Sequence, residues 1–129
     1  HLAELIRYYP KVEIALGDSV DILEEILSTI STGPMTFWLD AHASGPLGGG
    51  KSGGSPLIDE LKLIAQHDVK THTIFIDDRR LFGSAEWGGI KEEDAMNLLR
   101  SINPDYQIVY LDGEVPGDII CAYVQKNSA

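Results

Sequence analysis

Two short apolar runs that end in acidic residues constrain the fold of this chain more than any other feature. The run 36–40 reads Thr-Phe-Trp-Leu-Asp, and the run 73–78 reads Thr-Ile-Phe-Ile-Asp-Asp. Both are too short for a helix and are rich in β-branched and aromatic residues, which indicates buried strands of a parallel sheet. Ligands of open α/β sheets bind beyond the carboxyl ends of the strands. We therefore expect Asp40, Asp77 and Asp78 at one ligand-binding edge.

Helical and strand patterns alternate along the chain. Helices are expected at about 2–9, 20–30, 56–67 and 91–102, and strands at 12–16, 36–40, 73–77, 106–111 and 118–125. Strands that alternate with helices indicate a mostly parallel sheet with right-handed crossovers. The last two strands, separated by a short turn, indicate an antiparallel hairpin. The sequence therefore predicts a single α/β domain over residues 1–129.

The composition restricts the partners and the compartment that we expect. A formal net charge of -10 disfavours nucleic acid and anionic membranes as partners. Cys121 is the single cysteine, so an internal disulfide is impossible and a reducing, cytoplasmic location is expected. The sequence contains neither a segment with the length and apolarity of a membrane span nor a recognisable secretory signal.

Residues 45–52 match the pattern G-x-x-x-x-G-K-[ST] of the phosphate-binding loop in P-loop NTPases. In such a loop the Lys-Ser pair lies in the first turn of a helix, where the amide N–H groups face the phosphates. Here two glycines and Pro56 follow Ser52, which delays the helix by four or more residues. A glycine-rich lid over the strand ends is the preferred interpretation, and a P-loop NTPase is an alternative.

Three segments near the predicted strand ends resemble class I S-adenosylmethionine-dependent methyltransferases. These segments are Phe37-Trp38-Leu39-Asp40-Ala41-His42, Pro56-Leu57 with Glu60-Leu61, and Ile74-Phe75-Ile76-Asp77-Asp78. The closest branch of the family comprises the metal-dependent O-methyltransferases similar to macrocin O-methyltransferase. The resemblance covers about residues 2–125 and includes the closing β-hairpin. It implies the transfer of a methyl group from S-adenosylmethionine to a hydroxyl of a small-molecule substrate.

The resemblance also implies a role for each residue at the strand ends. One strand of the family ends in Asp-x-Asp, a metal ligand followed by the catalytic base, and the matching residues here are Asp40 and His42. The next strand ends in two metal ligands, matched by Asp77 and Asp78. A divalent cation, Mg²⁺ above all, is therefore expected on the three carboxylates. His42 replaces an acid, and an imidazole suits proton abstraction at neutral pH.

The cofactor part of the family's site has only a partial match. A strand of the family that ends in Gly-Asp lines the adenine side of the cofactor pocket, and Asp18 with Ser19 matches this position. A helix N-cap is an equal alternative for Asp18. The family's glycine-rich turn and the acid that bind the rest of the cofactor have no counterpart here. The chain is thus expected to be the C-terminal two thirds of the fold, without the N-terminal cofactor-binding strands.

The expected fold is a Rossmann-like, methyltransferase-like three-layer sandwich truncated at its N-terminus. Its mixed sheet has five strands in the order 1-2-3-5-4, and the last strand runs antiparallel between strands 73–77 and 106–111. The edge of strand 36–40 then pairs with strand 12–16 or is covered by another chain, and a homodimer is expected. The alternative to a methyltransferase, besides the NTPase, is a non-catalytic Rossmann-like module for binding or oligomerisation.

Other conspicuous side chains also have structural interpretations. Each acid can cap a helix or pair with Arg79 or Arg80, and pairing is the expected role of these two arginines. Trp38 and Cys121 are predicted to lie in the core, whereas Trp87 packs against its loop or covers a ligand. The histidines away from the strand ends are expected to be surface or structural residues; they are His1, His67 and His72.

Overall fold

The computed structural model describes residues 19–29, 33–40 and 56–125, and within them the chain forms an α/β fold with an open mixed sheet. Its helices are α2 (Ser19–Thr29), α3 (Leu57–Gln66) and α4 (Glu92–Ile102). Its strands are β1 (Thr36–Leu39), β2 (Thr73–Ile76), β3 (Gln107–Leu111) and β4 (Ile119–Tyr123). Two short 3-10 helices, η2 (Arg79–Leu81) and η3 (Ala85–Trp87), follow β2. None of the described helices combines the length and apolarity that a bilayer crossing requires.

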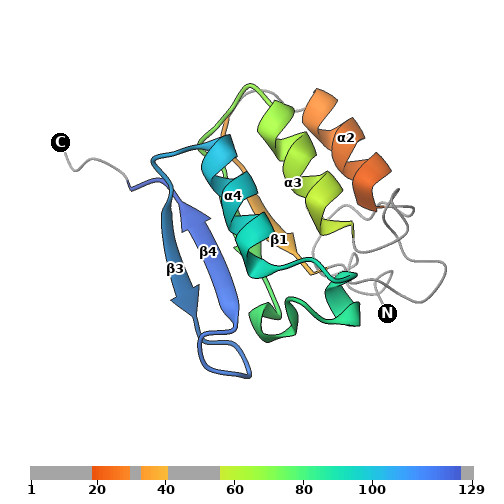
Figure 1. The fold of residues 1–129 in the computed structure, drawn as a ribbon. Coiled ribbons are helices and arrows are strands. Elements are labelled where there is room, and N and C mark those ends of the chain that lie inside the picture. Colours follow the sequence, from red (N-terminus) through yellow and green to blue (C-terminus); the bar gives the residue numbers. More distant parts are fainter. Residues whose placement is uncertain (1–18, 30–32, 41–55, 126–129) are drawn as a thin grey trace, which may run out of the picture.

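The sheet order is β1-β2-β4-β3, with β1 parallel to β2 and with β4 antiparallel to both of its neighbours. The final strand therefore lies between β2 and β3, as the hairpin pattern predicted. Figure 1 shows the three helices side by side across one face of this sheet, with α4 nearest to the hairpin and α2 farthest from it.

The predicted number and order of the strands require correction. The sheet of the described residues has four strands, so the five-stranded order 1-2-3-5-4 does not match it. The strand predicted at 12–16 lies outside the described residues, and β1 is consequently an edge of the described sheet. Within the described residues α2, α3 and α4 all cover the same face of the sheet (Figure 1), and the helix predicted at 2–9 lies outside the described residues.

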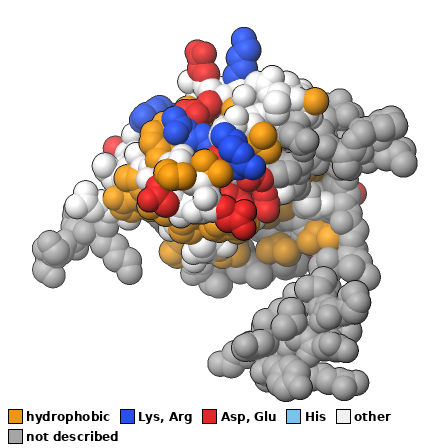
Figure 2. Space-filling model, turned by 90° about the horizontal axis from the view of Figure 1, so that it is seen from below, with side chains coloured by type: hydrophobic (Ala, Val, Ile, Leu, Met, Phe, Trp, Pro, Cys, Tyr) orange, Lys and Arg blue, Asp and Glu red, His pale blue; other side chains and the backbone are white. Residues whose placement is uncertain are grey.

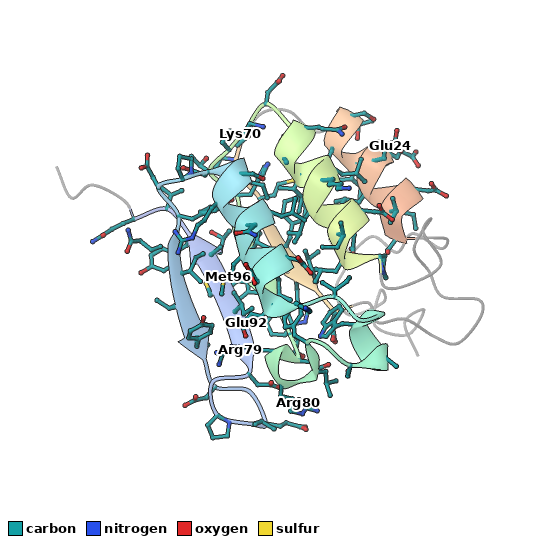
Figure 3. All side chains as sticks on the ribbon, in the orientation of Figure 1. Glu24, Lys70, Arg79, Arg80, Glu92 and Met96 are labelled. Atoms are coloured by element: carbon teal, nitrogen blue, oxygen red, sulfur yellow. The ribbon has the colours of Figure 1, made fainter. Side chains whose placement is uncertain are left out.

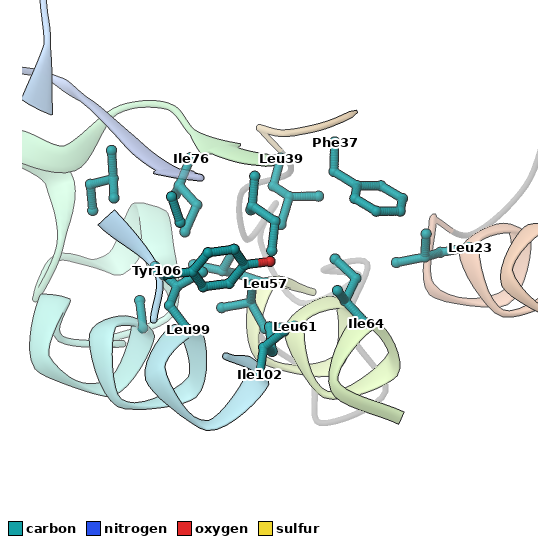
Figure 4. Packing of buried hydrophobic residues seen from close by; sticks show 14 of the residues in the cluster. Leu23, Phe37, Leu39, Leu57, Leu61, Ile64, Ile76, Leu99, Ile102 and Tyr106 are labelled. Carbon is teal, nitrogen blue, oxygen red and sulfur yellow. The ribbon is translucent and has the colours of Figure 1, made fainter. Parts of the chain in front are cut away.

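Alternation along the strands and a stripe along each helix build the core. Phe37 and Leu39 of β1, with Ile74 and Ile76 of β2, are buried and join one cluster with the helices. Three residues of α3 form a fully buried apolar stripe along the helix; they are Leu57, Leu61 and Ile64. Figure 4 shows this stripe facing the side chains of β1 and β2.

The prediction that Trp38 is a core residue was wrong, because successive strand residues point to opposite faces of a sheet. Phe37 and Leu39 face the helices, so Trp38 faces the other way and is 54% exposed. Its ring stacks on Phe75 with the centroids 5.5 Å apart. Cys121, by contrast, is buried as predicted.

A hydrogen-bonded histidine pair lies where β1 and β2 begin. Nδ1 of His72 accepts the Met35 N–H at 2.8 Å, and the other nitrogen, Nε2, lies 2.8 Å from Nδ1 of His67. Since Nδ1 of His72 is an acceptor, its neutral ring carries the hydrogen on Nε2 and donates it to His67. The hydroxyl of Tyr106 donates to the His72 carbonyl at 2.6 Å. Both histidines are buried structural residues.

Candidate metal centre

The register of β1 and β2 brings the two acidic strand ends together. Leu39 pairs with Ile76, and the Asp77 N–H donates to the Leu39 carbonyl at 3.2 Å. Asp40 and Asp77, each the next residue along its strand, therefore emerge beside one another at the carboxyl end of the sheet. This is the edge at which parallel α/β sheets bind their ligands.

Asp78 joins this pair because the backbone turns immediately after β2. Consecutive residues of a regular strand point to opposite faces, yet Asp78 has φ 59° and ψ 44°, the left-handed conformation. Its N–H donates to Oδ1 of Asp77 at 2.9 Å. Its carbonyl accepts the N–H of Leu81 and the indole N–H of Trp87, each at 3.0 Å. A non-glycine residue in this conformation costs of the order of 1 kcal/mol.

The three carboxylates have a separation that suits a single cation. One oxygen each from Asp40, Asp77 and Asp78 lie within 4.8 Å of one another. Two oxygens bound to one Mg²⁺ or Ca²⁺ at its usual bond length lie at most about 4–5 Å apart. Asp40 is exposed and the other two are half-buried, so hydrated ions have access. The donor set consists of hard oxygen ligands alone and fits Mg²⁺, Mn²⁺ or Ca²⁺.

A hollow of about 200 Å³ adjoins the two carboxylates that follow β2. Its lining consists of Asp77, Asp78, Arg80, Glu114, Val115 and Asp118. The last three belong to the hairpin loop or the start of β4, so the closing hairpin forms one wall of the site. Figure 2 shows acidic and basic side chains side by side on the face seen from below, with apolar side chains around them.

Both arginines of η2 pair with acids, as predicted. Arg79 donates from Nε to Oε1 of Glu92 at 2.7 Å, and its guanidinium lies 3.8 Å above the Tyr110 ring. Arg80 donates from Nη1 to Asp78 and to Asp118. These contacts hold the turn after β2 against α4 on one side and against the hairpin on the other.

The remaining predicted site residues fall in different parts of the chain. His42 and Asp18 lie outside the described residues, as does the glycine-rich segment 45–52. Ser19 is the first residue of α2 and lines a groove of about 330 Å³ beside β1, together with Trp38 and Glu60. The structure therefore brings the three predicted metal ligands together and places Ser19 in a separate groove.

The α3 boundary bears on the phosphate-loop alternative. This helix begins at Leu57, the fifth residue after Ser52. The Lys-Ser pair therefore does not lie in the first turn of α3, where a phosphate loop requires it.

Sequence reasoning missed the residues that support Asp78. Asp118 precedes an apolar strand and so resembles any other turn residue in sequence. Trp87 is fully buried and bonds the Asp78 carbonyl, but no spacing in the sequence links the two. Comparison of the chain with protein-family models, curated proteins and solved structures found no match.

Proposed function

We propose that this chain carries the metal-binding part of an S-adenosylmethionine-dependent O-methyltransferase that acts on a hydroxyl of a small molecule. The observation that carries the proposal is the convergence of Asp40, Asp77 and Asp78 within 4.8 Å at the carboxyl edge of the sheet. The strand-end motifs that resemble this family contain the same three residues.

The three carboxylates would hold Mg²⁺ or a similar ion, and such an ion orients substrate oxygens and lowers the pKa of a hydroxyl. S-adenosylmethionine, when bound, would supply the electrophilic methyl group. His42, two residues after Asp40 in the chain, is proposed to accept the hydroxyl proton as the oxygen bonds to the methyl carbon. The bound S-adenosylmethionine would lose its methyl group by cleavage of the carbon–sulfur bond, and the sulfur would keep the electron pair as a neutral thioether. The hollow beside Asp77 and Asp78 would take the substrate between the proposed metal ligands and the hairpin.

Thermal-shift titration of the whole chain tests the proposal against its alternatives. The methyltransferase proposal predicts a rise in Tm with Mn²⁺ or Mg²⁺, and a further rise when S-adenosylmethionine is added, because ligands that bind only the folded state stabilise it. An NTPase would respond to ATP with Mg²⁺ instead. A binding or oligomerisation module would respond to neither. The absence of any response to divalent cations would refute the metal-dependent function.

A further inference from the structure

Asp118 is a buried carboxylate that lines the hollow beside the candidate metal centre from the segment before β4. It directly precedes β4 and is 5% exposed. Burial of a carboxylate is costly unless hydrogen bonds compensate it. Here Oδ1 accepts the Arg80 N–H at 2.8 Å, Oδ2 contacts Nη1 of the same arginine, and the backbone carbonyl accepts the Arg79 N–H at 2.8 Å. Asp118 therefore binds two successive residues of the turn that follows β2.

The same Nη1 of Arg80 also donates to Oδ1 of Asp78 at 3.1 Å. One nitrogen thus bridges two carboxylates, and the contact with Asp118 is the shorter one. The Arg80 side chain is 49% exposed, so without its ion pairs it could adopt many rotamers. Its anchor is the buried Asp118, which binds both the backbone and the guanidinium of Arg80. Figure 3 shows Arg80 at the lower end of the molecule, beyond Arg79 and Glu92.

This bridge has an electrostatic consequence for the metal ligand. A guanidinium that paired with Asp78 alone would neutralise this carboxylate and compete with a cation. Because Asp118 shares the guanidinium, one positive group faces two carboxylates, so the three side chains keep a net negative charge beside the metal ligands while Arg80 still directs the Asp78 side chain. We propose that Asp118 is a positioning residue for Asp78 that acts through Arg80. The inference rests on the proposed metal-dependent function and adds a residue that the family resemblance does not assign.

The test is a Mn²⁺ titration of the whole chain, in which free Mn²⁺ is followed by electron paramagnetic resonance. Asp118→Asn keeps the size of the side chain and removes its charge, and we expect it to weaken Mn²⁺ binding about tenfold or more. Asp105→Asn is the matched control, since it makes the same change at an exposed turn before β3 and should leave the affinity unchanged.

A double-mutant cycle separates positioning from a general structural role. In an Arg80→Met background, Asp118→Asn should change the Mn²⁺ affinity by less than about twofold, because its effect passes through Arg80. Thermal midpoints of all variants ensure that each titration reports folded protein. If Asp118→Asn does not fold, Asp118→Glu takes its place, since it keeps the charge and alters the reach.

The outcomes distinguish this inference from the function on which it rests. Unchanged Mn²⁺ affinity in Asp118→Asn, or the same loss with and without Arg80, would overturn the positioning role and leave the metal site intact. Failure of the wild-type chain to bind Mn²⁺ would overturn both the metal-dependent function and the role of Asp118. A loss of affinity that requires Arg80 supports the proposal.

Discussion

At the scale of single residues, Asp78 concentrates the most unusual features of the molecule. It is the non-glycine residue with positive φ in the described part of the chain, and its φ of 59° is a conformation that favours glycine. The backbone strain coincides with a predicted metal ligand, and strained residues of this kind occur preferentially at functional sites. The strain is a local cost that directs the carboxylate toward Asp40 and Asp77.

Paired substitutions at Asp78 measure this strain. Asp78→Gly and Asp78→Ala both remove the carboxylate, so both should lose Mn²⁺ binding. Glycine adopts φ 59° freely and alanine does not. We therefore expect the glycine variant to melt about 3–5 °C above the alanine variant, which corresponds to about 1 kcal/mol in a domain of this size. Equal thermal midpoints in calorimetry would show that the left-handed backbone costs nothing.

The buried His72 predicts a pH dependence of stability. Burial lowers the pKa of His72 below 6.5, and electrostatic interactions with His67 and Lys70 act in the same direction. The unfolded chain therefore binds a proton more readily than the folded chain does. The contribution of His72 to stability is fully present above pH 6.5 and is lost as the pH falls below that value toward the lowered pKa.

Urea unfolding at pH 7.5 and 5.5 measures this contribution. The free energy of unfolding should fall between the two pH values in the wild-type chain. His72→Gln offers an acceptor and a donor without a titrating charge, so its fall should be smaller. The difference between the two proteins isolates His72, because the other titrating groups contribute equally to the fall in both. An equal fall in both proteins would contradict the assignment to His72.

At the scale of elements, the α3 stripe predicts where stability resides. Leu61 is fully buried between the sheet and its neighbouring helices. Leu61→Ala should lower the free energy of unfolding by about 2–5 kcal/mol, because it removes buried methyl groups and leaves a cavity. Lys62→Ala, at the next and exposed position, should change it by less than about 0.5 kcal/mol. Denaturant midpoints measured side by side test both expectations.

The elements could be read from the sequence because their signals are local. The periods of α3 and α4 and the short apolar runs of β1 and β2 each lie within one segment, and the structure confirms them within one or two residues. The grouping of Asp40, Asp77 and Asp78 at one sheet edge followed from strand-end position, and the resemblance to a methyltransferase family suggested their role as metal ligands. The face of the sheet on which the Trp38 side chain lies could not be predicted, because the helices decide which face is buried. The support of Asp78 by Asp118 joins segments 40 residues apart, and no local pattern encodes that contact.

At the scale of the whole molecule, the edge of β1 is the basis of the proposed homodimer. Within the described residues β1 pairs with β2 alone, and Trp38 on this strand is 54% exposed. Open strand edges pair readily with other chains unless charges protect them. Light scattering should give twice the chain mass of 14.1 kDa. Trp38→Lys places a charge on the β1 edge strand and should reduce the measured mass to that of the monomer. Val109→Lys makes the same kind of change on the opposite edge strand β3 and should leave the dimer intact. A monomeric wild type would refute the dimer.

The position of Asp118 also has a kinetic consequence. The proposed site and its support draw on the ends of β1, β2 and β4, so the groups that would hold and orient an ion come from positions spread over 40 to 118 of the chain. Pairings between distant segments form late in folding, because they require closure of long loops. High-affinity ion capture should therefore coincide with docking of the hairpin onto β2. In a stopped-flow refolding experiment, the rate at which a metal ion is bound would therefore report the rate at which the hairpin pairs with β2.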